Sequence, residues 1–176
     1  MTIVERPART EYAEYYERYI GLVPDGDIVG YLTTQREEYR SLLSGLSEAQ
    51  GDHRYAPGKW NIKELICHVA DAERVFGYRA LHFARGDEAP LPSFDESLWA
   101  PQSGAAARTL KSMAAELDAV RGASVALVGS FTPEQLLRRG IASGMEVSVR
   151  ALAWKIGGHA QHHLNILKDR YLHIDN

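Results

Sequence analysis

Apolar residues recur at intervals of three and four along four long stretches of the chain, at about residues 28–46, 61–86, 110–127 and 148–172. This spacing places the apolar side chains on one face of an α-helix and leaves the other face polar. A shorter amphipathic stretch with four tyrosines, residues 10–20, precedes them. Amphipathic helices bury their apolar faces around a shared core. The pattern therefore predicts an all-α protein: a four-helix bundle with a short extra N-terminal helix.

The second stretch has the clearest helix start in the chain. Pro57 and Gly58 precede Asn61, a residue type that caps helix N-termini. Glu64 follows three residues later, where its side chain can complete a capping box. Gly86 predicts the end of this helix, because glycine readily adopts positive φ.

Between the third and fourth long helices the sequence predicts only short structures. Thr132 and Pro133 are typical of a helical turn, with threonine as the cap and proline at the first helical position. Gly140 and Gly144 bracket a tight excursion before the last helix. Internal repeats and linker-like stretches are absent from the sequence, so we expect a single domain over residues 1–176.

The charge of the chain is nearly balanced, with 20 basic and 23 acidic residues and no basic stripe. We therefore expect no nucleic-acid partner and no anionic membrane as a partner. No stretch approaches the roughly 20 apolar residues of a spanning helix, and the first residues do not resemble an export signal. Cys67 is the only cysteine, which fits a reducing compartment. These features predict a cytoplasmic protein.

Two histidines of the fourth stretch, His159 and His163, are four residues apart. A helix places such a pair on one face, about 5–6 Å apart at Cβ. They share that face with the apolar residues Leu152, Ile156 and Ile166. We therefore expect both imidazoles to point into the bundle, where a buried polar group needs a partner. Two imidazoles in this arrangement can share one metal ion.

His68 on the second stretch is the candidate for a third ligand. It lies one turn from Leu65 and Ala72, at the edge of that helix's apolar face. Three imidazoles from two helices leave coordination positions open, as in catalytic metal sites. The alternative is that carbonyl or carboxylate groups satisfy the buried histidines without a metal. Spacing alone leaves both possibilities open.

The remaining histidines are weaker candidates. His162 also forms a helical pair with His159, but it shares its face with Lys155 and Asp169, which indicates an outward position. Three further histidines have no helical partner histidine and are expected to be ordinary surface or satisfied residues: His53, His82 and His173.

Three carboxylates are candidates for supporting roles. Asp71 lies one turn after His68 and could orient that imidazole, although a solvated acid on a helix flank is an equal alternative. Asp95 and Glu96, in the loop after the second helix, could act as general bases at the mouth of the site. A solvated loop acid is the alternative for both.

Five other residues are expected to be structural. Cys67 is rotated about 100° from His68 around the helix, which favours a buried thiol outside the metal site. Trp60 and Trp154 are expected to pack in the core or in an interface. For Arg121 and Arg150, ion pairs at the surface are the expected fate.

Two segments resemble the DinB/YfiT-like superfamily of metalloenzymes: YAPGKWNIKELICHVADAERVFGYRALHFARGD and VSVRALAWKIGGHAQHHLNILKDRYL. The likeness covers about residues 12–172. The resemblance implies a four-helix bundle in up-down-down-up order and a homodimer. It also implies a metal triad, made of one histidine on the second helix and an HxxxH pair on the last. These positions correspond to His68, His159 and His163.

Such a site is expected to hold a divalent metal ion, zinc or nickel before manganese or iron, because imidazole suits the first two. A bound metal ion lowers the pKa of water from 15.7 to about 7, or stabilises a thiolate. Water activation leads to hydrolysis of a small-molecule substrate. Thiolate activation leads to S-transfer from a low-molecular-weight thiol such as bacillithiol or glutathione. The resemblance is greatest to family members regarded as metal-dependent hydrolases, so we expect a hydrolase. A thiol S-transferase and a non-catalytic metal-binding or stress-related protein are the alternatives.

Overall fold

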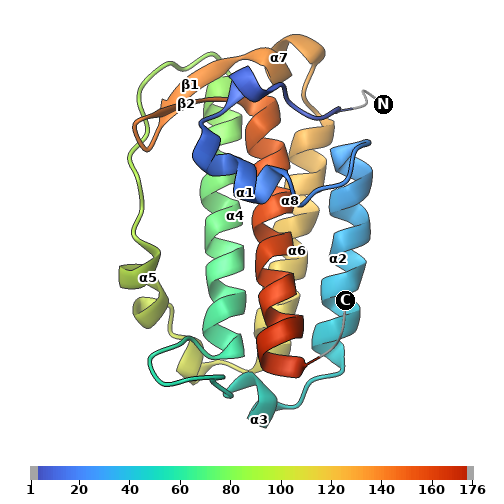
Figure 1. The fold of residues 1–176 in the computed structure, drawn as a ribbon, viewed down its shortest axis with the longest axis vertical. Helices are drawn as coiled ribbons and strands as arrows, with labels where there is room; N and C mark the ends of the chain where they lie inside the picture. Colours follow the sequence, from blue (N-terminus) through green and yellow to red (C-terminus); the bar gives the residue numbers. More distant parts are fainter. Residues whose placement is uncertain (1–3, 174–176) are drawn as a thin grey trace.

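The structure is a computed structural model that describes residues 4–173 of the 176-residue chain. Four long helices lie side by side (Figure 1): α2 (Ile28–Ser44), α4 (Ile62–Ala84), α6 (Leu110–Gly129) and α8 (Val149–Ile166). A π-helical segment, η4 (Leu167–Leu172), extends α8. The four-helix bundle predicted from the apolar periodicity is confirmed.

The order of the helices follows from the lengths of their connections. A short connection containing α3 (Glu48–Gly51) joins α2 to α4, and the two helices run in opposite directions. Residues 85–109 then return along the length of the bundle and carry α5 (Glu96–Gln102) and η3 (Ala105–Ala107). Consequently α6 runs parallel to α4, and α8 runs back antiparallel to both, packed against α4 and α2. This is the up-down-down-up order (Figure 1).

The start of α4 is capped as its sequence predicts. The Oδ1 atom of Asn61 accepts a hydrogen bond from the backbone N–H of Glu64 at 2.8 Å, and Oε2 of Glu64 accepts from the backbone N–H of Asn61 at 2.8 Å. At the other end Arg85 caps the helix, and Gly86 follows with a φ of +82°. These contacts fix where His68 lies along the helix, two turns after the cap.

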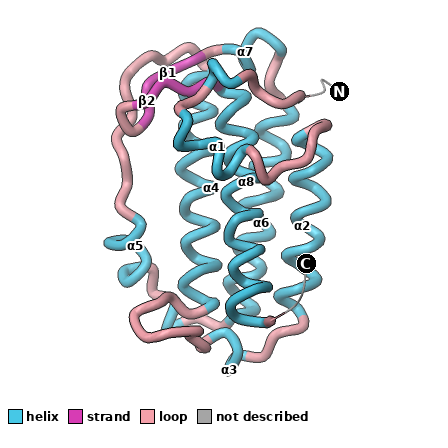
Figure 2. Tube along the Cα trace, in the orientation of Figure 1, coloured by secondary structure: helices cyan, strands magenta, loops and turns pink. Residues whose placement is uncertain are grey.

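A short hairpin precedes α8 (Figure 2). It follows α7 (Pro133–Leu137), and its strands are β1 (Arg139–Ala142) and β2 (Met145–Ser148). The strands are antiparallel, with Arg139 opposite Ser148, and the turn residues Ser143 and Gly144 both have positive φ, 55° and 74°. Two positive φ values in succession suit a two-residue hairpin turn. The excursion predicted here is therefore a two-stranded sheet.

The N-terminal segment packs against α8 and not only against the outside of the bundle. The predicted helix over residues 10–20 is divided into η1 (Arg9–Glu11), η2 (Glu14–Tyr16) and α1 (Glu17–Ile20). Tyr16 and Ile20 are buried, and every residue from 151 to 160 of α8 is buried as well. As a result α8 has no broad solvent face in its first three turns.

The interior contains a polar network that connects all four long helices. Arg121 on α6 forms a bidentate ion pair with Glu73 on α4, at 2.8 and 2.9 Å, and both side chains are at most 3% exposed. Nη1 of Arg121 also donates to Oε1 of Gln35 on α2 at 2.6 Å, and Nε2 of Gln35 donates to the carbonyl of Gly157 on α8 at 3.2 Å. The prediction that Arg121 pairs at the surface was wrong, because its carboxylate partner comes from a helix distant in sequence.

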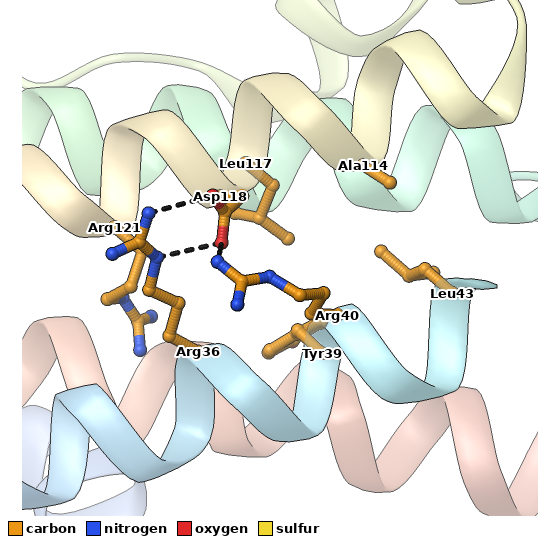
Figure 3. A pocket seen from close by; sticks show the side chains of 8 residues that line it. All are labelled: Arg36, Tyr39, Arg40, Leu43, Ala114, Leu117, Asp118 and Arg121. Atoms are coloured by element: carbon orange, nitrogen blue, oxygen red, sulfur yellow. Dashed lines mark hydrogen bonds and ion pairs between the residues drawn. The ribbon is translucent and has the colours of Figure 1, made fainter.

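A crevice beside this network lies between α2 and α6 (Figure 3). Arg36 and Arg40 both reach Asp118 across it, with nitrogen–oxygen distances of 2.7 and 2.8 Å. Its volume is about 10 Å³, which is room for about one water molecule. The crevice is therefore a seam between two packed helices and not a ligand site.

No helix within residues 4–173 combines the length and the apolar character of a membrane span.

Replacing Arg121 with methionine is expected to lower the free energy of unfolding by about 3–5 kcal/mol, because Glu73 is left as an unpaired buried carboxylate. The double variant Arg121→Met/Glu73→Leu should recover most of this loss, since it removes both charges together. Urea denaturation of the parent, the two single variants and the double variant measures the effect. Losses that simply add in the double variant would contradict the role of this pair.

Candidate metal centre

His68 on α4 and His159 and His163 on α8 come together between the two helices. The Nε2 atom of His159 lies 3.2 Å from Nε2 of His68 and 3.2 Å from Nε2 of His163. One ring nitrogen from each of the three lies within 4.8 Å of the other two. The i, i+4 spacing on α8 supplies two of the rings, and the packing of α4 on α8 supplies the third.

Burial keeps all three imidazoles neutral. It lowers the pKa of His68 to about 4, and it lowers the pKa of His159 and of His163 well below the ordinary value, with further lowering from the neighbouring histidines. Neutral imidazole has a free lone pair on one ring nitrogen. The three side chains are therefore in the protonation state that binds a metal ion.

The arrangement fits a divalent metal ion. In a tetrahedral site with metal–nitrogen bonds of 2.0–2.1 Å, neighbouring nitrogens are about 3.3 Å apart, and the two short Nε2–Nε2 distances are 3.2 Å. The Nε2 atoms face one another and not a carbonyl or carboxylate, which favours the metal over the alternative that the sequence left open.

The three histidines form part of the wall of a cavity of about 440 Å³. Aromatic rings make up much of the remaining wall. Trp60 lies 4.8 Å from His68 between ring centroids, and Tyr19 and Phe76 each lie 5.4 Å from His159. Trp60, expected in the core or an interface, thus lies beside the site, and its distance of eight residues from His68 gave no signal of this.

The cavity also contains two residues of α8 that the sequence placed on the outside, Lys155 and His162. Lys155 is only 6% exposed, and the ring of His162 lies 5.5 Å from that of Tyr19. The outward assignment was wrong for Lys155, because α1 and η2 cover this side of α8. His162 is half-buried and lies outside the cluster of His68, His159 and His163, as the sequence predicted. A signal was nevertheless present, since Lys155 lies four residues before His159 and so continues the row of His159 and His163.

The candidate carboxylates lie in different surroundings. Oδ1 of Asp71 accepts from Arg74 at 3.1 Å, and burial raises the pKa of Asp71. Asp95 is exposed and caps α5, where Oδ1 accepts from the backbone N–H of Ser97 at 2.9 Å. Glu96 lines the cavity. The roles of Asp71 as an orienting group and of Asp95 as a general base stay predictions.

Comparison with known families identifies one family model that covers most of the bundle. The model of the DinB superfamily matches residues 31–167 of this chain. The match extends from the first turn of α2 into η4, so it includes both helices that carry the three histidines.

Curated relatives match over most of their own length. A protein of Oceanobacillus iheyensis is 30% identical over 72% of this chain and 73% of its own. A protein of Bacillus licheniformis is 31% identical over 80% of this chain and 81% of its own. Both are named "Putative metal-dependent hydrolase".

A solved structure has the same fold. YfiT from Bacillus subtilis superposes with a TM-score of 0.71 over 97% of this chain and 95% of that one, at 17% identity. It is described as "a probable metal-dependent hydrolase with an unusual four-helix bundle topology". At this identity the likeness concerns the fold.

Close contact between α1 and α8 holds the cavity wall in place. Gly158 precedes His159, and a Cβ atom added to it would lie 2.1 Å from the carbonyl oxygen of Tyr19. Backbone cannot yield as a flexible side chain does. Only glycine at this position allows α1 to bring Tyr19 against the ring of His159.

Gly158→Ala is therefore expected to displace the N-terminal segment and to lower the free energy of unfolding by about 1–3 kcal/mol. Gly77→Ala on α4 is the matched control, because its added Cβ would lie 3.9 Å from the nearest neighbouring atom, in Leu127. The control should be neutral or stabilising by up to about 1 kcal/mol. Thermal unfolding and the rate of proteolysis near Tyr19 measure both variants. Equal behaviour of the two variants would show that the contact is unimportant.

Proposed function

The chain belongs to the DinB superfamily, and on that premise we propose that it is a metal-dependent hydrolase acting on a small molecule. His68, His159 and His163 hold one divalent metal ion in this proposal, and zinc or nickel suits three imidazoles best. The observation that carries the proposal is that the three rings converge on a cavity. The names of the two curated relatives support the same reaction class.

The cavity argues against a purely structural metal. Structural sites are closed, with four protein ligands, whereas catalytic sites keep a position open for water or substrate. Here residues 4–173 offer three ligands, and about 440 Å³ of space adjoins them. This volume lies in the range of roughly 300–1,000 Å³ that is typical of small-molecule sites.

In this proposal the residues of the cavity wall have different roles in hydrolysis. When bound, the metal ion supplies a water molecule whose pKa is lowered to about 7. The neutral imidazoles leave the positive charge of the ion uncompensated, which strengthens this effect. Trp60, Tyr19 and Phe76 exclude bulk water and hold the apolar part of the substrate. We assign the transfer of a proton to Glu96, the acidic side chain among the described residues of the wall.

His163→Ala is expected to lower the affinity for zinc or nickel by more than about 100-fold, since loss of a mere supporting hydrogen bond to a metal ligand already costs about 10- to 100-fold. His162→Ala is the matched control: it removes a neighbouring imidazole of the same helix that is outside the triad. Elemental analysis after dialysis and calorimetric titration with the metal measure both variants. Parent-like metal content in His163→Ala would refute the assignment of the ligands.

Metal-loaded protein is further expected to hydrolyse small activated esters or amides, and chelation should abolish the reaction until metal is restored. His163→Ala should lack this metal-dependent rate, while His53→Ala, which removes an exposed imidazole outside the cavity wall, should retain it. Product release is followed by absorbance with and without added bacillithiol or glutathione. Turnover that strictly requires the thiol would point to S-transfer and would contradict hydrolysis.

A further inference from the structure

The side chain of Lys155 is largely buried and its ammonium group lines the cavity, with no carboxylate paired to it among the residues that the structure describes. Its Nζ atom lies 3.6 Å from the ring centroid of Tyr16 and 4.3 Å from that of Phe76. Within residues 4–173 it has neither a hydrogen-bond acceptor nor an ion-pair partner. The residue is only 6% exposed, and it lines the cavity.

Two arginines of the same wall also lack a carboxylate partner among the described residues. Arg79 is 2% exposed, and its Nη2 atom donates to the carbonyl of Pro92 at 2.6 Å and to Oγ of Ser143 at 3.0 Å. Nη2 of Arg18 donates to the hydroxyl of Tyr19 at 2.7 Å. These neutral acceptors leave the buried charge of Arg79 uncompensated, whereas Arg18 is exposed to solvent.

Elsewhere in the described residues, buried cationic side chains are paired with carboxylates. Arg121 has Glu73, and Lys63, 6% exposed in its side chain, has two carboxylates within 3.0 Å. In the cavity, by contrast, the two buried cations Lys155 and Arg79 have no carboxylate paired to them among the described residues, and the acid of the wall is the exposed Glu96. Unpaired charges in a region of low polarity cost free energy unless a ligand compensates them.

Burial is the largest influence on the pKa of Lys155, and the neighbouring cations act in the same direction. Burial, together with the charges of Arg79 and Arg18, lowers the pKa of Lys155 to about 7, while Glu96 opposes the shift. An anion bound beside the ammonium group would favour its charged form.

The position of Lys155 relates this charge to the metal centre. Lys155, His159 and His163 form one i, i+4 row on α8, so Lys155 lies one turn, about 6 Å along the axis, before the first histidine ligand. The ring of Phe76 contacts both Lys155 and His159. A small ligand can therefore reach from the cationic side chains to the three histidines along an aromatic surface.

We propose that the substrate carries an oxyanion group, a carboxylate or a phosphate, which Lys155 and Arg79 bind about one helical turn from the three-histidine site. The proposal rests on the proposed function, because it names the substrate class of the same site. The aromatic wall receives the apolar body of the substrate, and the group to be hydrolysed lies at the three histidines. Lys155 is thus a specificity-determining residue.

The test uses benzoate and its neutral analogue benzamide as probes on the full-length protein freed of metal, so that benzoate cannot bind to a metal ion. The parent should bind benzoate at least about 10-fold more tightly than benzamide, as expected for a charge-assisted hydrogen bond. Lys155→Met should reduce this preference to about 2-fold or less. Lys111→Met, which removes an exposed lysine of α6, should leave it unchanged. Dissociation constants come from titrations followed by NMR, and phenylphosphonate in place of benzoate distinguishes phosphate from carboxylate recognition.

Equal affinities for benzoate and benzamide in the parent, no benzoate binding at millimolar concentration, or an undiminished preference in Lys155→Met would each overturn the proposal. Circular dichroism checks that Lys155→Met is folded, and Lys155→Gln provides a second neutral variant if it is not. The result is separable from the proposed function. If the protein prefers benzoate but binds no metal, the proposed anion site is supported and the proposed hydrolase function is refuted. If the metal-loaded protein hydrolyses neutral esters faster than anionic ones, the hydrolase function is supported and the proposed anion site is refuted.

Discussion

The geometry of the three-histidine cluster depends on the buried network of Arg121, Glu73 and Gln35. Unpaired charge in the interior is costly, so the helices that carry these residues must meet in the one register that pairs them. Gln35 extends the constraint to α8 by donating to the carbonyl of Gly157, two residues before His159. A second bond, from the hydroxyl of Tyr39 to the carbonyl of Ala160 at 2.7 Å, lies just after that histidine. The polar interior thereby sets α8 against α4, and with it the distance from His159 to His68.

The sequence predicts those parts of this arrangement that are local. The four helices follow from the 3.6-residue period, the start of α4 follows from Asn61 and Glu64, and the inward direction of His159 and His163 follows from their apolar neighbours. Contacts between distant segments are not encoded in any local pattern. The ion pair of Arg121 with Glu73 joins residues 48 positions apart, so a surface position was the default expectation. The hairpin before α8 was also missed, because four-residue strands are too short to show a period of two.

The errors on α8 have one physical cause. Periodicity analysis assigns polar residues to solvent, which holds for a helix with one free face. Here η2 and α1 cover that face, and Gly158 permits their backbone to approach within the space that a Cβ atom would occupy. A glycine inside a helix lowers helix stability by about 1 kcal/mol relative to alanine. Gly158 therefore makes α8 intrinsically less stable, but it permits the contact with α1. In return Tyr16 and Tyr19 enclose Lys155 and His162, which turns a solvent-facing side of the helix into the wall of a cavity.

Enclosure has opposite consequences for the two kinds of basic side chain in that wall. For the histidines, desolvation removes the proton and leaves the lone pair that a metal ion requires, so burial prepares the ligands. For Lys155, the same desolvation makes the charged form costly and lowers its pKa to about 7. At the proposed anion site, a bound anion would reverse that cost one helical turn from the place where the metal ion would sit. In the proposed function, a cavity with this distribution of charge would discriminate among substrates by the group that does not react, while the three histidines would determine the group that does.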